Sequence, residues 1–493
     1  MNLLSYFYQR ARRSCWATIL AALTVTAITT IIAGCGSSSA IPPGSPIPGE
    51  TTSMTLLASG SANDRLSQYN IAFNSVTLTS RSGKTVSLFT TPESAEFTHL
   101  NGTAEPLATV NVPQDVYTAA SASIKGSSFT CVSLLSNPVT LQTSYFAING
   151  ALPTTVTLPS PITVTGTAMG LLLDLQVSQS ATFSNCYGPS ATYSITPTFT
   201  LTPVSLASPP TNVENGKVTG LEGQIASVNA TGDSFNVAAA DGPSWSVQSN
   251  GSTLYQGISG FAALAVGMPV DMDVAIQSDG SVLATRVAVV DPDTTALSVV
   301  GGPLLFVSQA QPSLDSLGRD EQGYLFSPPI GGALPLSFGN VVYQTSGQFT
   351  NLQSLPFPAS FNAATIFTGQ IVLFTSHALS ISGGPTYVPA TTATLMPQTI
   401  NGAVSAVSSS GSFTTYTLTL APYDLIPALA VQPGQTTVLT NPSSVVVYVD
   451  SSTQPLNTTP LAVGSVLRFN GLIFDDNGTL RMACGQVNDG VTP

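Results

Sequence analysis

Histidine, cysteine and carboxylate side chains are the groups of this 493-residue chain that could do chemistry. The two histidines, His99 and His377, are too few for a metal site built on several imidazoles, and no cysteine pair has zinc spacing. No Gly-x-Ser-x-Gly sequence occurs, so the nucleophile elbow of many esterases is missing. A Ser-His-Asp triad would need one of the two histidines, and each is better explained as a solvated or packed side chain. We therefore predict no catalytic residue, no metal ligand and no enzymatic activity.

The acidic residues do not indicate a catalytic reaction either. A glycosidase needs two carboxylates a few ångströms apart across a cleft, and no spacing in the sequence predicts that geometry. Residues 475–477 (Asp-Asp-Asn) could offer oxygens to Ca²⁺, but a hairpin turn at Asn477-Gly478 explains the same residues. There is no P-loop and no dinucleotide fingerprint, so we expect no cofactor. The other carboxylates that we considered flank loops or lie in an apparent insertion: Glu93, Glu96, Asp315, Asp320 and Glu321.

Cys35 is the one residue whose chemistry the sequence predicts. It follows Ile-Ala-Gly at positions 32–34, an aliphatic residue and two small ones. Residues 16–34 carry no charge, and three arginines precede them. This arrangement resembles the lipobox and signal peptide of bacterial lipoproteins. The resemblance implies cleavage between Gly34 and Cys35 and attachment of fatty acyl groups, such as palmitate, to Cys35.

The lipid on Cys35 would be the contact of this protein with a membrane. In such families, Gly36 rather than Asp after the acylated cysteine implies export to the outer membrane. We therefore expect a cell-envelope protein that is lipid-anchored to the outer membrane, on either its periplasmic or its outer face. The alternative is an uncleaved N-terminal anchor, because residues 16–34 approach spanning length, although they are rich in Thr and Ala. Residues 36–50 (GSSSAIPPGSPIPGE) have no apolar period and predict an extended tether of about 3 Å per residue.

Composition limits the partners. Only 7% of residues are charged, and 43% are hydrophobic. Without the three arginines of the signal peptide, 12 − 3 = 9 basic residues face 24 acidic ones, a net charge of about −15. An acidic chain without a basic stripe is a poor ligand for nucleic acid. We expect no nucleic-acid partner, and a glycan or a surface protein in its place.

Three more cysteines bear on the exported state. Cys131 and Cys186 fall in one expected domain, and export permits a disulfide between them; two buried free thiols are the alternative. Cys484 has no partner left and lies in an apolar strand-like sequence. We interpret it as a buried small residue rather than a nucleophile.

The first domain shows short alternating segments separated by turn residues, which is typical of an all-β fold. Leu171, Leu173, Leu175 and Val177 are predicted on one face of a strand, and Asp174, Gln176 and Ser178 on the other. Segments of this domain resemble an uncharacterised lipoprotein domain family, although Asp115-Val116 replaces the usual glycine before Tyr117: 71–78, 99–103, 112–117 and 172–175. The resemblance implies an immunoglobulin- or transthyretin-like sandwich.

The remainder contains an internal repeat. Residues 223–228 align with 402–407, and Leu-Ala-Val-Gly at 264–267 recurs at 461–464. The strand that follows alternates in both copies, and its apolar positions match in order: Val270, Met272, Val274 and Ile276 with Leu467, Phe469, Gly471 and Ile473. The intervening positions are mostly polar, and the turns Asp279-Gly280 and Asn477-Gly478 close each hairpin.

A divergent copy lies between the two, with an insertion expected around residues 313–329. The repeated motif resembles another uncharacterised bacterial domain family, which implies an OB-like barrel. The expected fold is all-β, with an N-terminal β-sandwich followed by a tandem array of small OB-like β-barrels. The expected domains are a signal peptide (1–34), a tether (35–50), the sandwich (51–206) and three barrels (212–292, 296–398 and 399–493).

Three classes of function fit these observations. The first is a non-catalytic surface lipoprotein whose β-modules serve as a scaffold, a spacer or an adhesive arm. The second is a ligand-binding surface lipoprotein, with glycans as the expected ligands. The third is a hydrolase with a site that the sequence does not reveal. Because no catalytic group can be assigned, we expect the first class.

Overall fold

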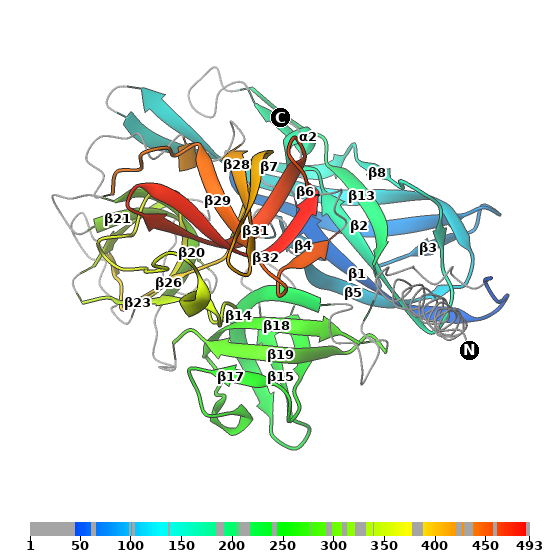
Figure 1. Ribbon diagram of the computed structural model, residues 1–493. Coiled ribbons are helices and arrows are strands. Elements are labelled where there is room, and N and C mark those ends of the chain that lie inside the picture. The colour runs from blue at the N-terminus through cyan, green and yellow to red at the C-terminus, as the bar shows by residue number, and fades with distance from the viewer. Residues whose placement is uncertain are drawn as a thin grey trace, which may run out of the picture. The chain divides into compact units, whose positions relative to one another are not determined.

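β-Strands make up almost all of the regular secondary structure that the computed structural model describes, which confirms the predicted all-β class (Figure 1). The structure describes residues 45–60, 66–97, 100, 104–136, 139–183, 192–204, 206, 217–238, 244–277, 279–291, 298–307, 313–320, 332–338, 340–376, 388–420, 426–427, 437–456 and 461–489. Residues 46–493 form one compact unit. Across the described ranges, no helix has the length and apolar character needed to span a membrane.

The N-terminal part of this unit contains two main sheets. One has the strand order β5-β1-β10-β13-β8 and the other β3-β2-β6-β7, with β4 paired to β2 and β9 to β6. The strands of the first sheet are β1 (Thr51–Gly60), β5 (Ala104–Pro113), β8 (Thr155–Thr157), β10 (Ala168–Leu175) and β13 (Thr198–Val204). The second contains β2 (Leu66–Ser80), β3 (Thr85–Ser87), β4 (Glu93–Glu96), β6 (Val116–Ser136), β7 (Val139–Leu152) and β9 (Ile162–Thr163). A short helix and a two-stranded sheet complete this part: α2 (Val177–Ser180), β11 (Ala181–Phe183) and β12 (Tyr193–Ile195).

Aromatic side chains join the two sheets in one core. Phe73 of β2 and Phe199 of β13 have ring centroids 5.7 Å apart, and Phe97 packs against both. The predicted strand at 171–178 is corrected in part. It ends at Leu175, and Val177 begins α2. Asp174, predicted on the face opposite the leucines, is buried as well, with 9% of it exposed.

The first barrel is a closed sheet of five main strands. The order is β16-β15-β14-β18-β19, and parallel pairing of β16 with β19 closes it. Alternating apolar residues such as Val270, Met272 and Val274 of β18 fill its interior, which explains why this sequence forms a strand here. Its elements are β14 (Lys217–Asn229), β15 (Ser234–Ala238), β16 (Ser244–Gln248), β17 (Leu254–Gln256), η1 (Phe261–Ala263), β18 (Pro269–Ile276) and β19 (Val282–Val289).

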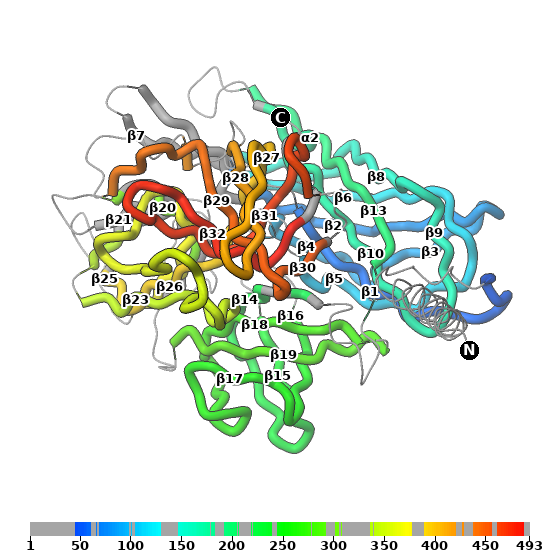
Figure 2. The backbone as a smooth tube through the Cα atoms, in the orientation of Figure 1, coloured from blue at the N-terminus to red at the C-terminus, as the bar shows by residue number. Residues whose placement is uncertain are grey.

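The third barrel repeats this topology (Figure 2). Its order is β29-β28-β27-β31-β32, closed by parallel pairing of β29 with β32, and β30 adds to β32 as β17 adds to β19. The strands are β27 (Gln398–Ser410), β28 (Phe413–Leu420), β29 (Ser444–Val449), β30 (Gln454–Leu456), β31 (Val466–Asp476) and β32 (Thr479–Asp489).

The middle barrel has the same order with its last strand broken in two. β26 pairs with β24, and β25 pairs with β22, so the two pieces together close the sheet. The expected insertion at 313–329 is wrong in its first half, because residues 313–320 form β21, which pairs with β20 and β22. Its leucines are three residues apart, so no alternation marked the strand. The elements are β20 (Ser298–Val307), β21 (Ser313–Asp320), β22 (Gly332–Ser337), β23 (Val342–Thr345), η2 (Leu352–Ser354), β24 (Ile371–Ser376), β25 (Val388–Pro389) and β26 (Thr392–Leu395).

One turn marks the same place in all three barrels. Gly267, Gly369 and Gly464 have φ values of 95°, 97° and 89°, a region that L side chains rarely adopt. The N–H of each glycine donates a hydrogen bond to the carbonyl oxygen of one residue in the first strand of its barrel. The N–H of that same residue donates to the carbonyl oxygen of the residue that follows the glycine. The repeated Leu-Ala-Val-Gly sequence is therefore the sequence of a fixed turn before the fourth main strand.

Candidate functional site

The residues that the sequence singles out for chemistry lie largely outside the described part of the chain. Gly34, Cys35, Cys186 and both histidines are not among the described residues. Cys131 lies in β6, and its side chain is not described. Acylation of Cys35 and the disulfide between Cys131 and Cys186 therefore stay predictions.

Cys484 is a buried free thiol in β32, as expected. Burial raises the pKa of this thiol, which keeps it protonated at neutral pH. Its Sγ donates to the carbonyl oxygen of Gln486 at 3.1 Å. The side chain is a packing group without the features of a nucleophile.

Residues 475–478 form the predicted hairpin turn. Asn477 and Gly478 have φ values of 54° and 86°, and the Gly478 N–H donates to Asp475 Oδ1 at 2.7 Å. Asp476 accepts a bond from Arg481 Nε at 2.5 Å. Both carboxylates thus have protein partners, and within the described ranges no group of three His, Cys, Asp or Glu residues could hold a metal ion.

A buried ionic cluster lies between β18 and β19 of the first barrel. Arg286 Nε donates to Asp273 Oδ2 at 2.9 Å, and Arg286 Nη2 donates to Asp271 Oδ1 at 3.1 Å. All three side chains are nearly inaccessible to solvent. Burial alone would lower the pKa of Arg286, but the two carboxylates outweigh it and raise the pKa, so the guanidinium stays charged. We call Asp271, Asp273 and Arg286 the Asp-Arg cluster.

A segment of the middle barrel covers the Asp-Arg cluster. Ser346, which follows β23, donates its hydroxyl to Asp271 Oδ2 at 2.7 Å. Ser346 is itself only 2% exposed. Sequence alternation placed Asp271 and Asp273 on a polar face of β18, yet every residue of β18 is buried. The covering group comes from 75 residues further along the chain, so local periodicity could not reveal it.

In every barrel, polar residues form the cross-strand pair that is equivalent to Asp273 and Arg286. The cross-strand pair is Asn470 opposite Gln486 in the third barrel, and Thr375 opposite Thr392 in the middle barrel. Thr375 Oγ1 lies 2.6 Å from Thr392 Oγ1 and donates to Asp291 Oδ2 at 2.8 Å. One site of the repeat thus carries an ion pair, an amide pair or a hydroxyl pair.

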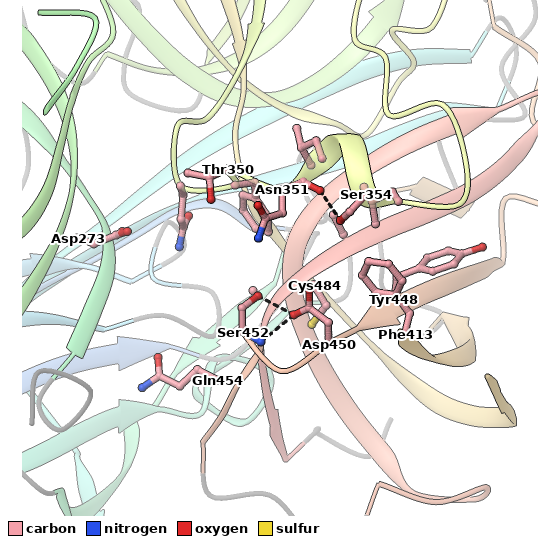
Figure 3. A pocket seen from close by; sticks show the side chains of 16 residues that line it. Asp273, Thr350, Asn351, Ser354, Phe413, Tyr448, Asp450, Ser452, Gln454 and Cys484 are labelled. Carbon is pink, nitrogen blue, oxygen red and sulfur yellow. Dashed lines mark hydrogen bonds between the residues drawn. The ribbon is translucent and has the colours of Figure 1, made fainter. Parts of the chain in front are cut away.

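Next to the Asp-Arg cluster lies a cavity of about 170 Å³ (Figure 3). One wall is the segment at 348–355, which Figure 3 shows with Thr350, Asn351 and Ser354 above the cavity. Asp450 and Ser452 lie below it, and Phe413 and Tyr448 lie on the side away from Asp273. The described residues that line it are Asp273, Gln348, Phe349, Thr350, Asn351, Leu352, Ser354, Leu355, Phe413, Tyr448, Asp450, Ser452, Gln454, Ala483, Cys484 and Gly485.

The described residues of the lining can form hydrogen bonds, but none of them make a pair suited to acid-base or nucleophilic catalysis. They include no Lys, Arg or His. Asp273 is paired with Arg286, and Asp450 Oδ1 caps a turn by accepting bonds from the backbone N–H and hydroxyl of Ser452. Cys484 is the thiol described above. This arrangement can bind a polar ligand and supplies no evident base or nucleophile.

The sequence did not predict the cavity, because residues of the first barrel, of the segment at 348–355 and of the third barrel build it together. A signal was nevertheless present in the repeat. Gln454 pairs with Gln486 in the third barrel as Leu254 pairs with Arg286 in the first. Gly485 lies at the bulge between β31 and β32, and Thr285 lies at the equivalent bulge between β18 and β19. The third barrel therefore differs from the first at these two residues of the lining.

Comparison with known protein families finds a match in the first barrel. Residues 222–288 match the family model of a domain of unknown function (DUF5666), which spans the chain from within β14 to within β19. No curated protein matches the chain. The matched module agrees with the expectation of an uncharacterised β-module and brings no reaction or ligand with it.

Proposed function

We propose that this protein is a lipid-anchored, non-catalytic cell-envelope protein whose β-modules act together as a surface scaffold or spacer. The observation that carries the proposal is the buried polar bonding between modules. Besides the Ser346–Asp271 bond, Gln370 Nε2 of the middle barrel donates to the Ile473 carbonyl of the third at 2.9 Å. A spacer that holds its end at a set distance needs modules that do not swing freely.

The first barrel also bonds to the sandwich. Trp245 is 5% exposed, and its indole Nε1 donates to the carbonyl oxygen of Pro106 at 3.0 Å. Because a buried indole N–H needs a partner, this bond favours one docked arrangement over others. The strand order of the barrels supports an OB-like assignment, and the two N-terminal sheets support the immunoglobulin- or transthyretin-like one; both assignments belong to this proposal.

In this proposal, Cys35 carries the lipid and residues 36–50 lift the compact unit from the membrane. The expected location is the outer membrane, as the resemblance to lipoproteins implies for Gly36. No two described residues of the cavity lining form a catalytic pair, which supports the non-catalytic part of the proposal. A hydrolase is a competing function. A hydrolytic activity of the purified protein that is lost in His99→Ala or His377→Ala would favour it.

Cys35→Ser tests the anchor directly. Cells grown with an alkyne analogue of palmitate should label the wild-type protein and not the variant, and the variant should leave the membrane fraction or accumulate unprocessed. Cys484→Ser is the matched control, because it removes a buried thiol and should keep the label. If Cys35→Ser stays in the membrane with the mass of the wild type, the anchor is uncleaved and the lipoprotein assignment is wrong.

A further inference from the structure

We propose that the cavity beside the Asp-Arg cluster binds one neutral sugar ring. This inference goes beyond the scaffold role and does not depend on it. Its residues come from the first barrel, from the segment at 348–355 and from the third barrel. The charge, hydrogen bonding, aromatic content, size and fixation of this cavity all favour such a ligand.

The charged groups of the cavity lining disfavour most other classes of small ligand. The described residues of the lining include no Lys, Arg or His that could offset the charge of a phosphate, sulfate or carboxylate ligand. The two carboxylates of the lining, Asp273 and Asp450, already accept hydrogen bonds from the protein, as described above. Half of the lining residues carry polar side chains, which disfavours a lipid tail. A neutral polar molecule remains.

The amide groups match a ligand with hydroxyls. Gln348 Oε1 is buried and accepts no hydrogen bond from the described residues, so a donor from a ligand would satisfy it. Gln454 Oε1 accepts a bond from Gln486 Nε2 at 3.4 Å, which orients the Gln454 amide and makes its Nε2 the donor available to a ligand. A lining that offers both an acceptor and a donor suits a polyol, because each sugar hydroxyl can donate one hydrogen bond and accept others.

Aromatic side chains supply an apolar wall. Phe349, Phe413 and Tyr448 line the cavity together with the polar groups. Gly485 permits this packing, because a Cβ at this position would lie 3.1 Å from Cζ of Phe349. The C–H face of a sugar ring can pack against such rings while its hydroxyls reach the amides.

Size limits the ligand to one ring. The cavity of about 170 Å³ is smaller than the pockets that enclose drug-sized molecules. The wall is also held from both sides: Ser346 bonds to Asp271 of the first barrel, and Phe349 packs on Gly485 of the third. A wall fixed before binding lowers the entropy that a small ligand must overcome.

The test uses the full-length protein in detergent and saturation-transfer NMR with methyl α- and β-glycosides of glucose, galactose, mannose and N-acetylglucosamine. We expect at least one glycoside to bind with Kd on the order of 1 mM, which its size allows. Gln454→Leu and Asn351→Ala should each weaken binding by roughly tenfold or more. Gln454→Leu introduces the residue that the first barrel has at the equivalent position, so it should fold.

The matched control is Leu254→Gln, which makes the reciprocal change in the first barrel and should leave binding unchanged. The proposal is overturned if no glycoside of the panel binds below about 10 mM, or if binding survives both Gln454→Leu and Asn351→Ala. Loss of binding in Leu254→Gln as well would also overturn it, because the site would then lie elsewhere. None of these results depends on Cys35 or on the membrane fraction.

Discussion

The first and third barrels show which parts of a repeat are fixed and which can vary. Both have the same strand order, the same parallel closure and the same glycine turn. They differ at a buried cross-strand pair, Asp273–Arg286 in one and Asn470–Gln486 in the other. Apolar alternation and the turn therefore determine the barrel, whereas the buried pair can change with the neighbouring module.

Two residues before this pair in the fourth main strand, the first and third barrels carry opposite charges. Asp271 of the first barrel bonds to Arg286 and Ser346, while Arg468 occupies the equivalent position in the third barrel and donates to the Gly60 carbonyl of the sandwich at 3.3 Å. A buried ion pair costs desolvation energy that its attraction offsets only with good geometry. Each barrel thus uses this position to contact a different neighbour.

The largest effect should come from breaking the Asp-Arg cluster. Arg286→Met leaves two buried carboxylates without their cation, and we expect a loss of about 3–5 kcal/mol in stability of the first barrel. Urea unfolding followed by the fluorescence of the buried Trp245 measures it. The triple variant Asp271→Asn/Asp273→Asn/Arg286→Gln introduces an amide pair like that of the third barrel and should regain most of the loss. Equal destabilisation of both variants would show that the charges are not the cause.

A smaller effect should separate two turns of the repeat. Gly464→Ala meets no atom within 4 Å, so only its φ of 89° opposes the substitution, at about 1–2 kcal/mol. Gly369→Ala should cost more, because its Cβ would lie 2.7 Å from Cγ1 of Ile426. Thermal midpoints by calorimetry rank the two variants. A Gly464→Ala protein that is the less stable of the two would contradict the equivalence of these turns.

The smallest effect concerns Asp174, which faces Arg468. Burial raises the pKa of Asp174, while Arg468, Ser59 and Gln176 act in the opposite direction. The folded state therefore binds this proton more tightly than the unfolded state, so stability falls as pH rises from the ordinary Asp value of about 3.9 through the raised pKa. Asp174→Asn should flatten this part of the curve in urea titrations between pH 3 and 7. An unchanged slope would show that Asp174 does not titrate in this way.

The sequence predicted the fold class and the turn at Asn477-Gly478, and it located the repeat. These features are local, because they depend on alternation and on residues that tolerate positive φ. The sequence missed β21 and did not reveal the burial of Asp174, because pairing and covering by distant segments decide both. The cavity escaped prediction for the same reason, since Asp273, Asn351 and Gln454 belong to three separate segments.

A pair of equivalent positions can show whether the barrels dock to each other as one scaffold. Val266 and Val463 precede the shared glycine turn in the first and third barrels and are 60% and 62% exposed. Spin labels on Val266→Cys/Val463→Cys, with the unsubstituted protein as the background control, give the distance between the two barrels by double electron–electron resonance. We predict one narrow distance distribution that broadens when Arg286→Met is added. A broad distribution in the labelled protein without Arg286→Met would show that the barrels move independently and would contradict the scaffold.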